Sequence, residues 1–302
     1  MHTFDPDSDV SLFGVNYQYT STNSSIAAAF ARTSFDADHQ RIVGIVIFGY
    51  IKNDYDDYLG TGQPLKTNDD LKAVSARYLY RVKGDWFIGA QGSAANYQVL
   101  GESAQDDLFL ETLGVRGFES AALGGVGMHD SRDNPDMPTN GWYLNVNNLA
   151  YREAFGGASS FDAYRADFKG FWPHGRGHVL AFRQYNWVTH DAPSAAQATV
   201  VLRGYKFGEY LAPYMSSFEA EERVSFNKRW GATLFAGLAS LYGEGDVAST
   251  ASTSSPGRDF YPGWGGGIHF VVKPDERMLI NLEYAAGVEG NRGVYLKFGY
   301  GW

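Results

Sequence analysis

The sequence feature that most limits the fold is a period-two alternation of apolar and polar side chains, recurring in segments of about ten residues. In the segment from 71 to 82, Val74, Tyr78 and Val82 share one face, while Ser75 and Arg77 share the other. Because successive side chains of a strand point to opposite faces, this pattern predicts strands with one apolar and one polar face. Similar alternation occurs in residues 13–20, 164–172 and 278–286.

The polar face indicates the environment. A soluble β-sandwich also alternates, but here the polar face of two segments carries charged side chains in series. These are Arg165, Asp167 and Lys169 on one segment and Glu219, Glu221 and Arg223 on the other. Charged inner faces beneath apolar, aromatic-rich outer faces are typical of transmembrane β-barrels. The most apolar stretch, residues 42–51, is too short for a spanning helix, so any membrane span must consist of strands.

The alternating segments predict about fourteen antiparallel strands, an even number as in bacterial barrels. The predicted strands span residues 10–20, 24–34, 38–52, 71–82, 85–98, 118–130, 141–155, 160–172, 177–190, 215–228, 231–243, 260–273, 277–288 and 292–302. Most connections alternate between tight turns and long polar loops, as at the periplasmic and extracellular ends of such barrels. The predicted fold class is therefore all-β, a transmembrane antiparallel β-barrel, with residues 1–302 as a single domain.

Composition excludes several kinds of partner. A net charge of -9 argues against nucleic acid, because phosphate binding needs Lys and Arg. The sequence has no Cys, and its seven His show no metal-ligand spacing, so we expect no metal and no cofactor. The first ten residues, MHTFDPDSDV, have neither a basic nor an apolar signal-peptide region, so we expect no signal peptide in this chain.

Two stretches carry more specific information. The stretch VLRGYKFGEYLAPYMSSFEAEERVSF, residues 201–226, contains the tripeptide Arg203, Gly204 and Tyr205, followed by Glu221 and Arg223. The stretch MHDSRDNPDMPTNGWYL, residues 128–144, contains a turn motif made of Asp130, Arg132, Asp133, Asn134 and Pro135.

These motifs, their spacing and the aromatic C-terminus resemble the BamA-like outer-membrane translocase superfamily, which includes TamA and the two-partner secretion transporters. The resemblance is closest to the branch without POTRA modules, the soluble domains that receive clients. It implies a non-enzymatic barrel in the outer membrane of a Gram-negative bacterium, usually of about sixteen strands. The barrel would insert or translocate protein or lipid, with a loop folded into the lumen and a weak seam between the first and last strands.

The same resemblance implies the partners. They are outer-membrane lipids and lipopolysaccharide, the barrel-assembly machinery for the protein's own insertion, and a client protein or lipid that the sequence does not identify. An alternative is a structural or lipid-contacting barrel, a homo-oligomer for example, without insertase activity. A barrel lipid hydrolase is a third interpretation, supported only by the adjacent His190 and Asp191.

An arginine that enters a barrel on a loop must find an acceptor, because a buried unpaired charge is costly. Glu219 and Glu221 share a face, so one of them is the expected partner of Arg203. The resemblance places a further acid on the next strand, where this chain has Gly237, so the pairing could depend on Glu221 alone. A loop held only for barrel stability, without a transport role, remains an equal alternative.

The turn motif is interpreted first as a turn, since Asp and Asn cap backbone groups and Pro stops strand pairing. A catalytic carboxylate pair is the sharper alternative, but no nucleophile or base accompanies it. The acidic loop with Asp54, Asp56 and Asp57 is more simply a solvated loop than a calcium site between lipopolysaccharides.

The chain ends in a further alternation, GVYLKFGYGW, residues 293–302. We expect Leu296, Phe298, Tyr300 and Trp302 to face lipid, with the last aromatic rings at the membrane interface. These four residues resemble the C-terminal signal that barrel-assembly machinery reads, although that signal usually ends in Phe. Gly299 and Gly301 fit a weakly packed closing strand.

Overall fold

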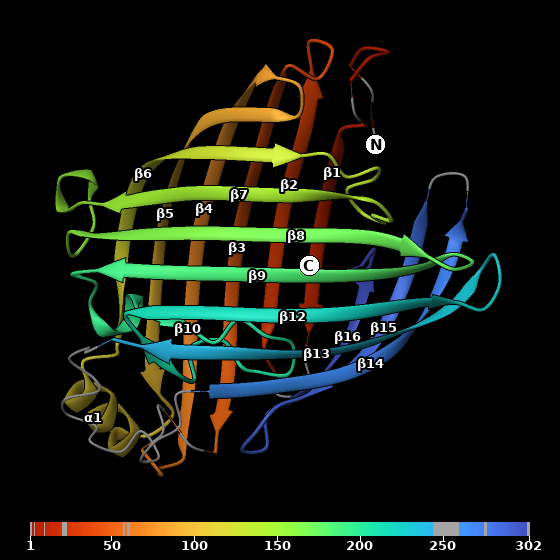
Figure 1. Ribbon diagram of the computed structural model, residues 1–302. Helices are drawn as coiled ribbons and strands as arrows, with labels where there is room; N and C mark the ends of the chain where they lie inside the picture. Colours follow the sequence, from red (N-terminus) through yellow and green to blue (C-terminus); the bar gives the residue numbers. More distant parts are fainter. Residues whose placement is uncertain are drawn as a thin grey trace.

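The computed structural model describes residues 2, 4–8, 10–19, 23–56, 58, 61–243, 260–274 and 277–300. Within these residues, fourteen strands form one antiparallel sheet in which each strand pairs with its neighbours along the chain (Figure 1). Their bounds are β1 Leu12–Tyr19, β2 Ser25–Phe35, β3 Gln40–Tyr55, β4 Leu65–Lys83, β5 Trp86–Gly101, β6 Gly117–Asp130, β7 Gly141–Tyr151, β8 Phe161–His174, β9 His178–His190, β12 Tyr214–Ser225, β13 Trp230–Tyr242, β14 Phe260–Lys273, β15 Met278–Ala286 and β16 Arg292–Phe298.

Among the described residues, five short elements lie in the connections. They are α1 Ala104–Leu113, η2 Glu153–Phe155, η3 Ser194–Ala196, β10 Ala198–Thr199 and β11 Leu211–Ala212, and β10 pairs with β11. In the described part of the chain, no helix is long and apolar enough to cross a membrane.

The strand prediction is confirmed in number and order, and most boundaries agree within a few residues. Two connections differ from the prediction. The β3–β4 hairpin continues to Tyr55 and Leu65, so half of the expected polar loop is paired backbone. The loop expected at 100–117 contains α1, which begins at a capping box formed by Ser103 and Asp106 and ends at Gly114, whose φ of 67° suits glycine.

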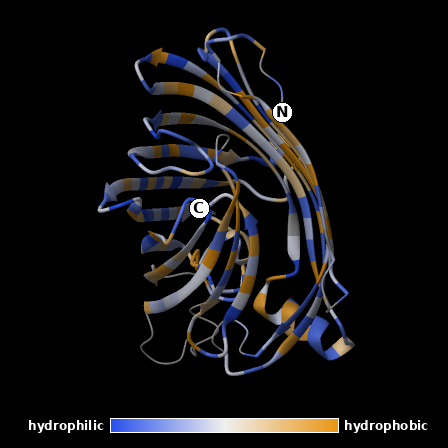
Figure 2. Ribbon diagram, turned by 90° about the vertical axis from the view of Figure 1, so that its right-hand side faces the viewer, coloured by the Kyte–Doolittle hydropathy of each residue, from blue (hydrophilic) through white to orange (hydrophobic). Residues whose placement is uncertain are grey.

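The sheet is strongly curved and forms a barrel that is open along one side (Figure 2). Its two edges are β1 and β16, and in the described residues no hydrogen-bonded ladder joins them. The tight turns, the beginning of β1 and the end of β16 lie at one end of the barrel, whereas α1, β10 and β11 lie at the other, the long-loop end. The loop expected at 243–260 falls almost entirely outside the described residues.

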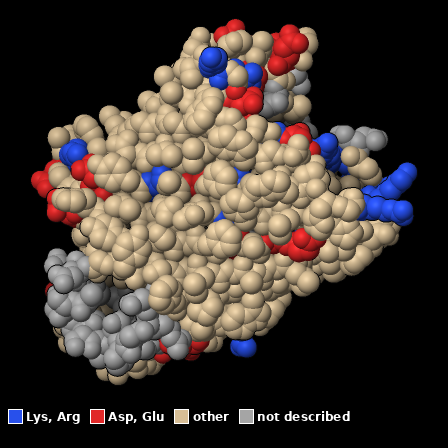
Figure 3. Space-filling model, viewed as in Figure 1, with Lys and Arg blue, Asp and Glu red and all other residues tan. Residues whose placement is uncertain are grey.

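The two faces of the sheet differ as the alternation predicts. Val15 is 84% exposed and Leu234 is 64% exposed on the outer face, while Glu221 and Arg223 are buried on the inner face. One side of the outer surface appears as a broad field of uncharged atoms, with most visible charges near its margins (Figure 3). The outer face therefore presents an apolar band of the kind that faces lipid.

The C-terminal alternation is only partly as expected. Leu296 and Phe298 point outward and are 70% and 80% exposed. Gly299 has a φ of 82°, which interrupts the strand geometry and turns Tyr300 inward. The ring of Tyr300 lies 3.8 Å from the guanidinium of Arg223, and its hydroxyl lies 3.1 Å from Nε2 of His269. The expectation that Tyr300 faces lipid is wrong, and Trp302 lies outside the described residues.

The exposure of Leu234 provides a test of the lipid-facing surface. Leu234→Lys should lower the free energy of unfolding in lipid vesicles by about 2–4 kcal/mol if this position lies near the bilayer midplane. Leu108→Lys in α1 is a matched control, because both leucines are 64% exposed but α1 lies outside the sheet. Equal losses for the two variants, measured by urea titration, would show that the outer face of β13 does not contact lipid.

Candidate functional site

The candidate site is formed by the segment between β9 and β12, residues 191–213, which we call the inner loop. Pairing between β10 and β11 closes the loop on itself, with Ala198 opposite Ala212 and Thr199 opposite Leu211. The chain between these two short strands carries Arg203, Gly204 and Tyr205 against the inner face of the sheet. The sequence motif thus lies inside the barrel.

Arg203 is surrounded by carboxylates. Its guanidinium nitrogens lie 2.6 Å from Glu219, 2.6 Å from Glu221 and 3.1 Å from Glu283. The guanidinium carbon also lies 3.4 Å from the ring centre of Phe235 on β13. All three carboxylates and the arginine are at least nine-tenths buried, so water does not screen these contacts.

Two further cations balance the charge. Arg223 Nε lies 2.6 Å from Glu221, and Lys297 Nζ lies 2.9 Å from Glu283. We call these six residues the lumen ion cluster: Arg203, Arg223, Lys297, Glu219, Glu221 and Glu283. Burial by itself would lower the pKa of Arg203, but Glu221, Glu219 and Glu283 raise it above its usual value. The cluster is neutral overall, which is the condition for keeping several charges buried together.

Gly204 and Tyr205 fix the loop on the last strands. The backbone N–H of Gly204 donates to the hydroxyl of Tyr295 at 2.9 Å. The hydroxyl of Tyr205 donates to the carbonyl of Pro262 at 2.6 Å and accepts from the N–H of Val288 at 3.2 Å. Together with Arg203, the tripeptide therefore contacts all five strands from β12 to β16.

The sequence anticipated part of this site. Arg203 meets both Glu219 and Glu221, the two partners expected for it. Glu283 was missed as a partner, because it lies 80 residues away and its position depends on the register of β15. The resemblance places a further acid at the position of Gly237, but a side chain does not fit there. A Cβ at Gly237 would lie 2.8 Å from the carbonyl oxygen of Phe218 and 3.0 Å from the side chain of Leu202.

The turn motif forms a compact structure between β6 and β7, residues 131–140, which we call the inner turn. Arg132 Nε donates to Asp130 at 2.7 Å, and Asn134 accepts from the N–H groups of Asp136 and Met137. Asp133 accepts from Thr139 and forms an ion pair with Arg277 at 2.5 Å. Burial favours a higher pKa for Asp133, but these hydrogen bonds from Thr139 and Arg277 lower it.

The inner turn also connects distant strands. Arg223 of the lumen ion cluster donates to the carbonyl of Pro138 at 2.9 Å. The carbonyl of Asp136 accepts from the N–H of Tyr300 at 3.1 Å, and its carboxylate lies 3.3 Å from Arg32 on β2. One turn therefore contacts strands on both sides of the open seam between β1 and β16.

The other candidates from the sequence are not assembled into sites. His190 Nδ1 lies 2.8 Å from Asp191, but both side chains are more than two-thirds exposed. Asp54 pairs with Lys66 at 3.2 Å, and Asp57 lies outside the described residues. Within the described ranges, no group of three or more His, Cys, Asp or Glu side chains is arranged to hold a metal ion.

Removal of the central cation should destabilise the loop. Arg203→Ala leaves three buried carboxylates without their shared partner, so we expect a loss of about 3–5 kcal/mol in unfolding free energy. Lys206→Ala is the control, since Lys206 is in the same loop but its Nζ donates to the backbone carbonyl of Asp54. A loss no larger than that of the control, in urea titrations of the vesicle-bound protein, would show that the ion cluster does not hold the loop.

Two glycines of the inner loop allow the effect of backbone conformation to be distinguished from the effect of steric crowding. Gly204 and Gly208 both have positive φ, 98° and 81°, but only a Cβ at Gly204 would meet backbone, 3.0 Å from the carbonyl carbon of Ala286. We expect Gly204→Ala to destabilise the protein by at least about 1 kcal/mol more than Gly208→Ala. Protease cleavage within the loop should rise in the same order, and equal effects would contradict the close seating of Gly204.

Comparisons with known proteins identify the family. None of the curated proteins compared with this chain has a significantly similar sequence. The structure resembles BamA from Haemophilus ducreyi, solved without POTRA domains 1–3, with a TM-score of 0.58 and 11% identity over 96% of this chain. It also resembles CdiB from Acinetobacter baumannii, with a TM-score of 0.58 and 9% identity over 95% of this chain.

The chain spans 64% of the length of the BamA structure and 53% of the CdiB structure, so these similarities concern the barrel fold. The sequence itself gives an independent assignment. The Omp85 superfamily domain matches residues 11–216, about two-thirds of the chain and the whole run from β1 to the beginning of β12. The chain therefore belongs to the Omp85 superfamily, with the barrel fold of BamA and CdiB.

Proposed function

We propose that this protein is a barrel of the Gram-negative outer membrane that inserts or translocates a client protein or lipid, and that it is not an enzyme. The observation that supports this most directly is the position of the inner loop. Arg203, Gly204 and Tyr205 are fixed to strands β12–β16, next to one edge of the open seam. The loop would act as a plug and as a brace for that edge.

The seam offers a physical route for a client. The bordering strands are short, with eight residues in β1 and seven in β16, compared with nineteen in β4. A sheet edge presents backbone N–H and C=O groups that can pair with another strand. A client segment would therefore enter by strand addition to β1 or β16. Its backbone N–H and C=O groups would then be hydrogen-bonded to the edge strand while the segment lies within the membrane.

The contacts of β2 and those among the C-terminal strands differ in strength. The ion pair between Arg32 and Asp136 is 37% and 55% exposed at its two side chains, and such pairs contribute little stability. The lumen ion cluster is buried and holds β12, β15 and β16 together. We infer that opening separates β1 and β2 from the inner turn, while strands β12–β16 move as one unit.

The remaining roles follow from the same proposal. Residues 1–302 would act as one barrel domain, surrounded by outer-membrane lipid and lipopolysaccharide. The signal for the barrel-assembly machinery would consist of Leu296, Phe298, Tyr300 and Trp302. Asp130, Arg132, Asp133, Asn134 and Pro135 would shape the periplasmic turn that contacts the seam.

A cross-linking experiment tests the role of the seam. The chain has no Cys, so paired cysteines can be introduced without background. Val15→Cys with Leu296→Cys places one thiol on each edge strand. A bis-methanethiosulfonate reagent would join them through two disulfides, with methanesulfinate as the leaving group, and a reductant would cleave the link. The probe is a urea-unfolded eight-stranded outer-membrane barrel, whose folding into vesicles is followed by gel mobility. We expect the uncross-linked protein to accelerate folding, the cross-linked protein to lose this effect, and reductive cleavage to restore it.

The matched control joins two strands away from the seam. Phe218→Cys and Leu238→Cys lie opposite each other on β12 and β13, and both native side chains are about half exposed. This cross-link should leave the acceleration unchanged. No acceleration by the wild-type protein would favour a structural or lipid-contacting barrel, and equal inhibition by both cross-links would exclude seam opening.

A further inference from the structure

Three cations gather on two neighbouring tight turns. The turn between β8 and β9 contains Arg176, and the turn between β12 and β13 contains Lys228 and Arg229; all three residues are exposed. The two turns lie side by side, because β9 pairs with β12 and the hydroxyl of Ser225 donates to the carbonyl of Gly177 at 2.8 Å. We call Arg176, Lys228 and Arg229 the cationic edge.

Among the described residues, no ion pair balances the charge of the cationic edge. The guanidinium of Arg229 donates to two backbone carbonyls, at 3.3 and 3.5 Å. Exposed cations at the long-loop end are different, because they have acidic neighbours. Lys66 lies 3.2 Å from Asp54, and Arg116 lies 3.5 Å from Asp107. The cationic edge therefore offers its positive charge to a partner outside the chain.

The cationic edge borders the apolar outer face of the sheet. Trp172 and Trp230 lie on that face beside the two turns and are 46% and 48% exposed. The guanidinium carbon of Arg229 lies 5.8 Å from the ring centre of Phe270, which is 4.8 Å from the ring of Trp230. Figure 3 shows Lys and Arg side chains projecting from the right-hand margin of the uncharged field, where Figure 1 places the two turns. Aromatic rings are favoured at the membrane interface, so the cations beside them lie at the depth of lipid headgroups.

A carboxylate on the same part of the outer face is engaged with other side chains. Glu222, on β12, lies 2.9 Å from Nε2 of His174 and 3.8 Å from Nδ1 of His178. It belongs to the strand, whereas the three cations are in the turns beyond the strand ends. The electrostatic potential just outside the two turns is therefore positive, which attracts anions to this place.

We propose that the cationic edge binds the phosphate of an anionic phospholipid, in the leaflet on the side of the tight turns. Arg176 and Arg229 can each donate two parallel hydrogen bonds to phosphate oxygens, and Lys228 adds a compact charge on a flexible stem. The acyl chains of the lipid would lie on the outer face against Trp172 and Trp230. Such a site depends on the proposed membrane location of the barrel and adds to it a preferred lipid at a defined place.

An anionic phospholipid fits both features of this surface. A zwitterionic lipid brings an ammonium with its phosphate, so it would leave the charge of the cationic edge uncompensated. An acidic protein segment would supply negative charge from the aqueous side, but it has no acyl chain to cover the exposed rings of Trp172 and Trp230. Each Lys or Arg near an anionic membrane surface strengthens association by about fivefold, so three cations give a clear preference for a lipid with net negative charge.

The test uses the full chain in a neutral detergent, with bound lipids counted by native mass spectrometry. The probes are phosphatidylglycerol and phosphatidylcholine with the same acyl chains. We expect phosphatidylglycerol to bind at least about tenfold more tightly, and this advantage to shrink as the salt concentration rises, since exposed charges are screened by salt. Equal affinity for the two lipids would overturn the proposal.

Two competitors identify the source of the anion. Glycerol 3-phosphate carries a phosphate without acyl chains, and a polyglutamate peptide carries carboxylates without a membrane anchor. Neither should displace phosphatidylglycerol at the same concentration, because the acyl chains add contacts with the outer face. Displacement by glycerol 3-phosphate would rule out a membrane lipid as the specific ligand, and displacement by the peptide would favour an acidic protein in its place.

Variants locate the lipid. The triple variant Arg176→Gln, Lys228→Gln and Arg229→Gln should bind phosphatidylglycerol no more tightly than phosphatidylcholine. Arg176→Gln and Lys228→Gln as single variants should each weaken phosphatidylglycerol binding by about fivefold, so they test the same contacts if the triple variant does not fold. Wild-type preference for phosphatidylglycerol in the folded triple variant, or in both single variants, would place the lipid elsewhere.

The matched control removes three exposed cations from the long-loop end, by Lys66→Gln, Arg116→Gln and Arg292→Gln. It changes the net charge by the same amount and should keep the preference for phosphatidylglycerol. Equal losses in the two triple variants would show that net charge, and not the cationic edge, selects the lipid.

The proposed insertion of a client is measured separately from the lipid site. The cationic edge is distant in sequence from β1 and β16, and it contains no residue of the lumen ion cluster. Acceleration of barrel folding in vesicles of phosphatidylcholine alone should therefore be the same for the Arg176→Gln, Lys228→Gln and Arg229→Gln triple variant and the wild type. Absence of acceleration in both would contradict client insertion while leaving the measured lipid preference intact.

Discussion

The burial of Arg203 among three carboxylates is the contact on which the interior of this barrel depends. A guanidinium on a loop would not enter a low-dielectric interior without charged partners, since the desolvation cost would exceed any gain. Glu219 and Glu221 come from β12 and Glu283 from β15, so the loop can be seated only after both strands are in place. The cluster thus couples the position of one loop to the correct register of the last five strands.

The cluster also extends beyond the loop. Arg223 forms an ion pair with Glu221 and donates a hydrogen bond to the carbonyl of Pro138, so one side chain connects the lumen ion cluster, which holds the inner loop, to the inner turn. The inner turn then reaches Arg32 on one side of the seam and Tyr300 on the other. Buried contacts hold the C-terminal strands, and exposed contacts cross the seam. This difference in burial is the physical reason to expect motion at β1 rather than within β12–β16.

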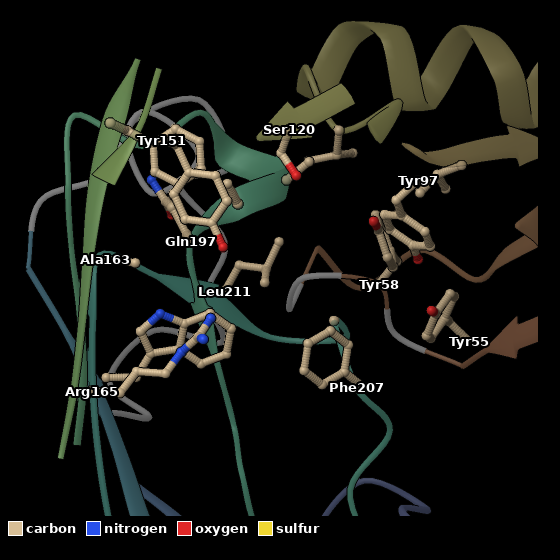
Figure 4. A pocket seen from close by; sticks show the side chains of 17 residues that line it. Tyr55, Tyr58, Tyr97, Ser120, Tyr151, Ala163, Arg165, Gln197, Phe207 and Leu211 are labelled. Carbon is tan, nitrogen blue, oxygen red and sulfur yellow. The ribbon is translucent and has the colours of Figure 1, made fainter. Parts of the chain in front are cut away.

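The inner loop has two faces with different chemistry. One face carries the Arg-Gly-Tyr tripeptide and is satisfied by the barrel itself. The other face contributes Gln197 and Phe207 to an aromatic pocket (Figure 4) in which several polar atoms are left without partners among the described residues.

The sequence by itself determined the strands, their number and the face that most side chains take, because alternation of side chains is a local property of an extended chain. It also placed Arg203 with Glu219 and Glu221, which lie on one face of a single strand. The sequence could not identify Glu283, since that contact depends on how β12 to β15 are staggered in the sheet. It placed Tyr300 on the wrong face, because one positive φ at Gly299 reverses the alternation. The pocket and the reach of the inner turn across the seam were decided only by the tertiary structure, since the curvature of the sheet brings together residues that are separated by a hundred positions or more.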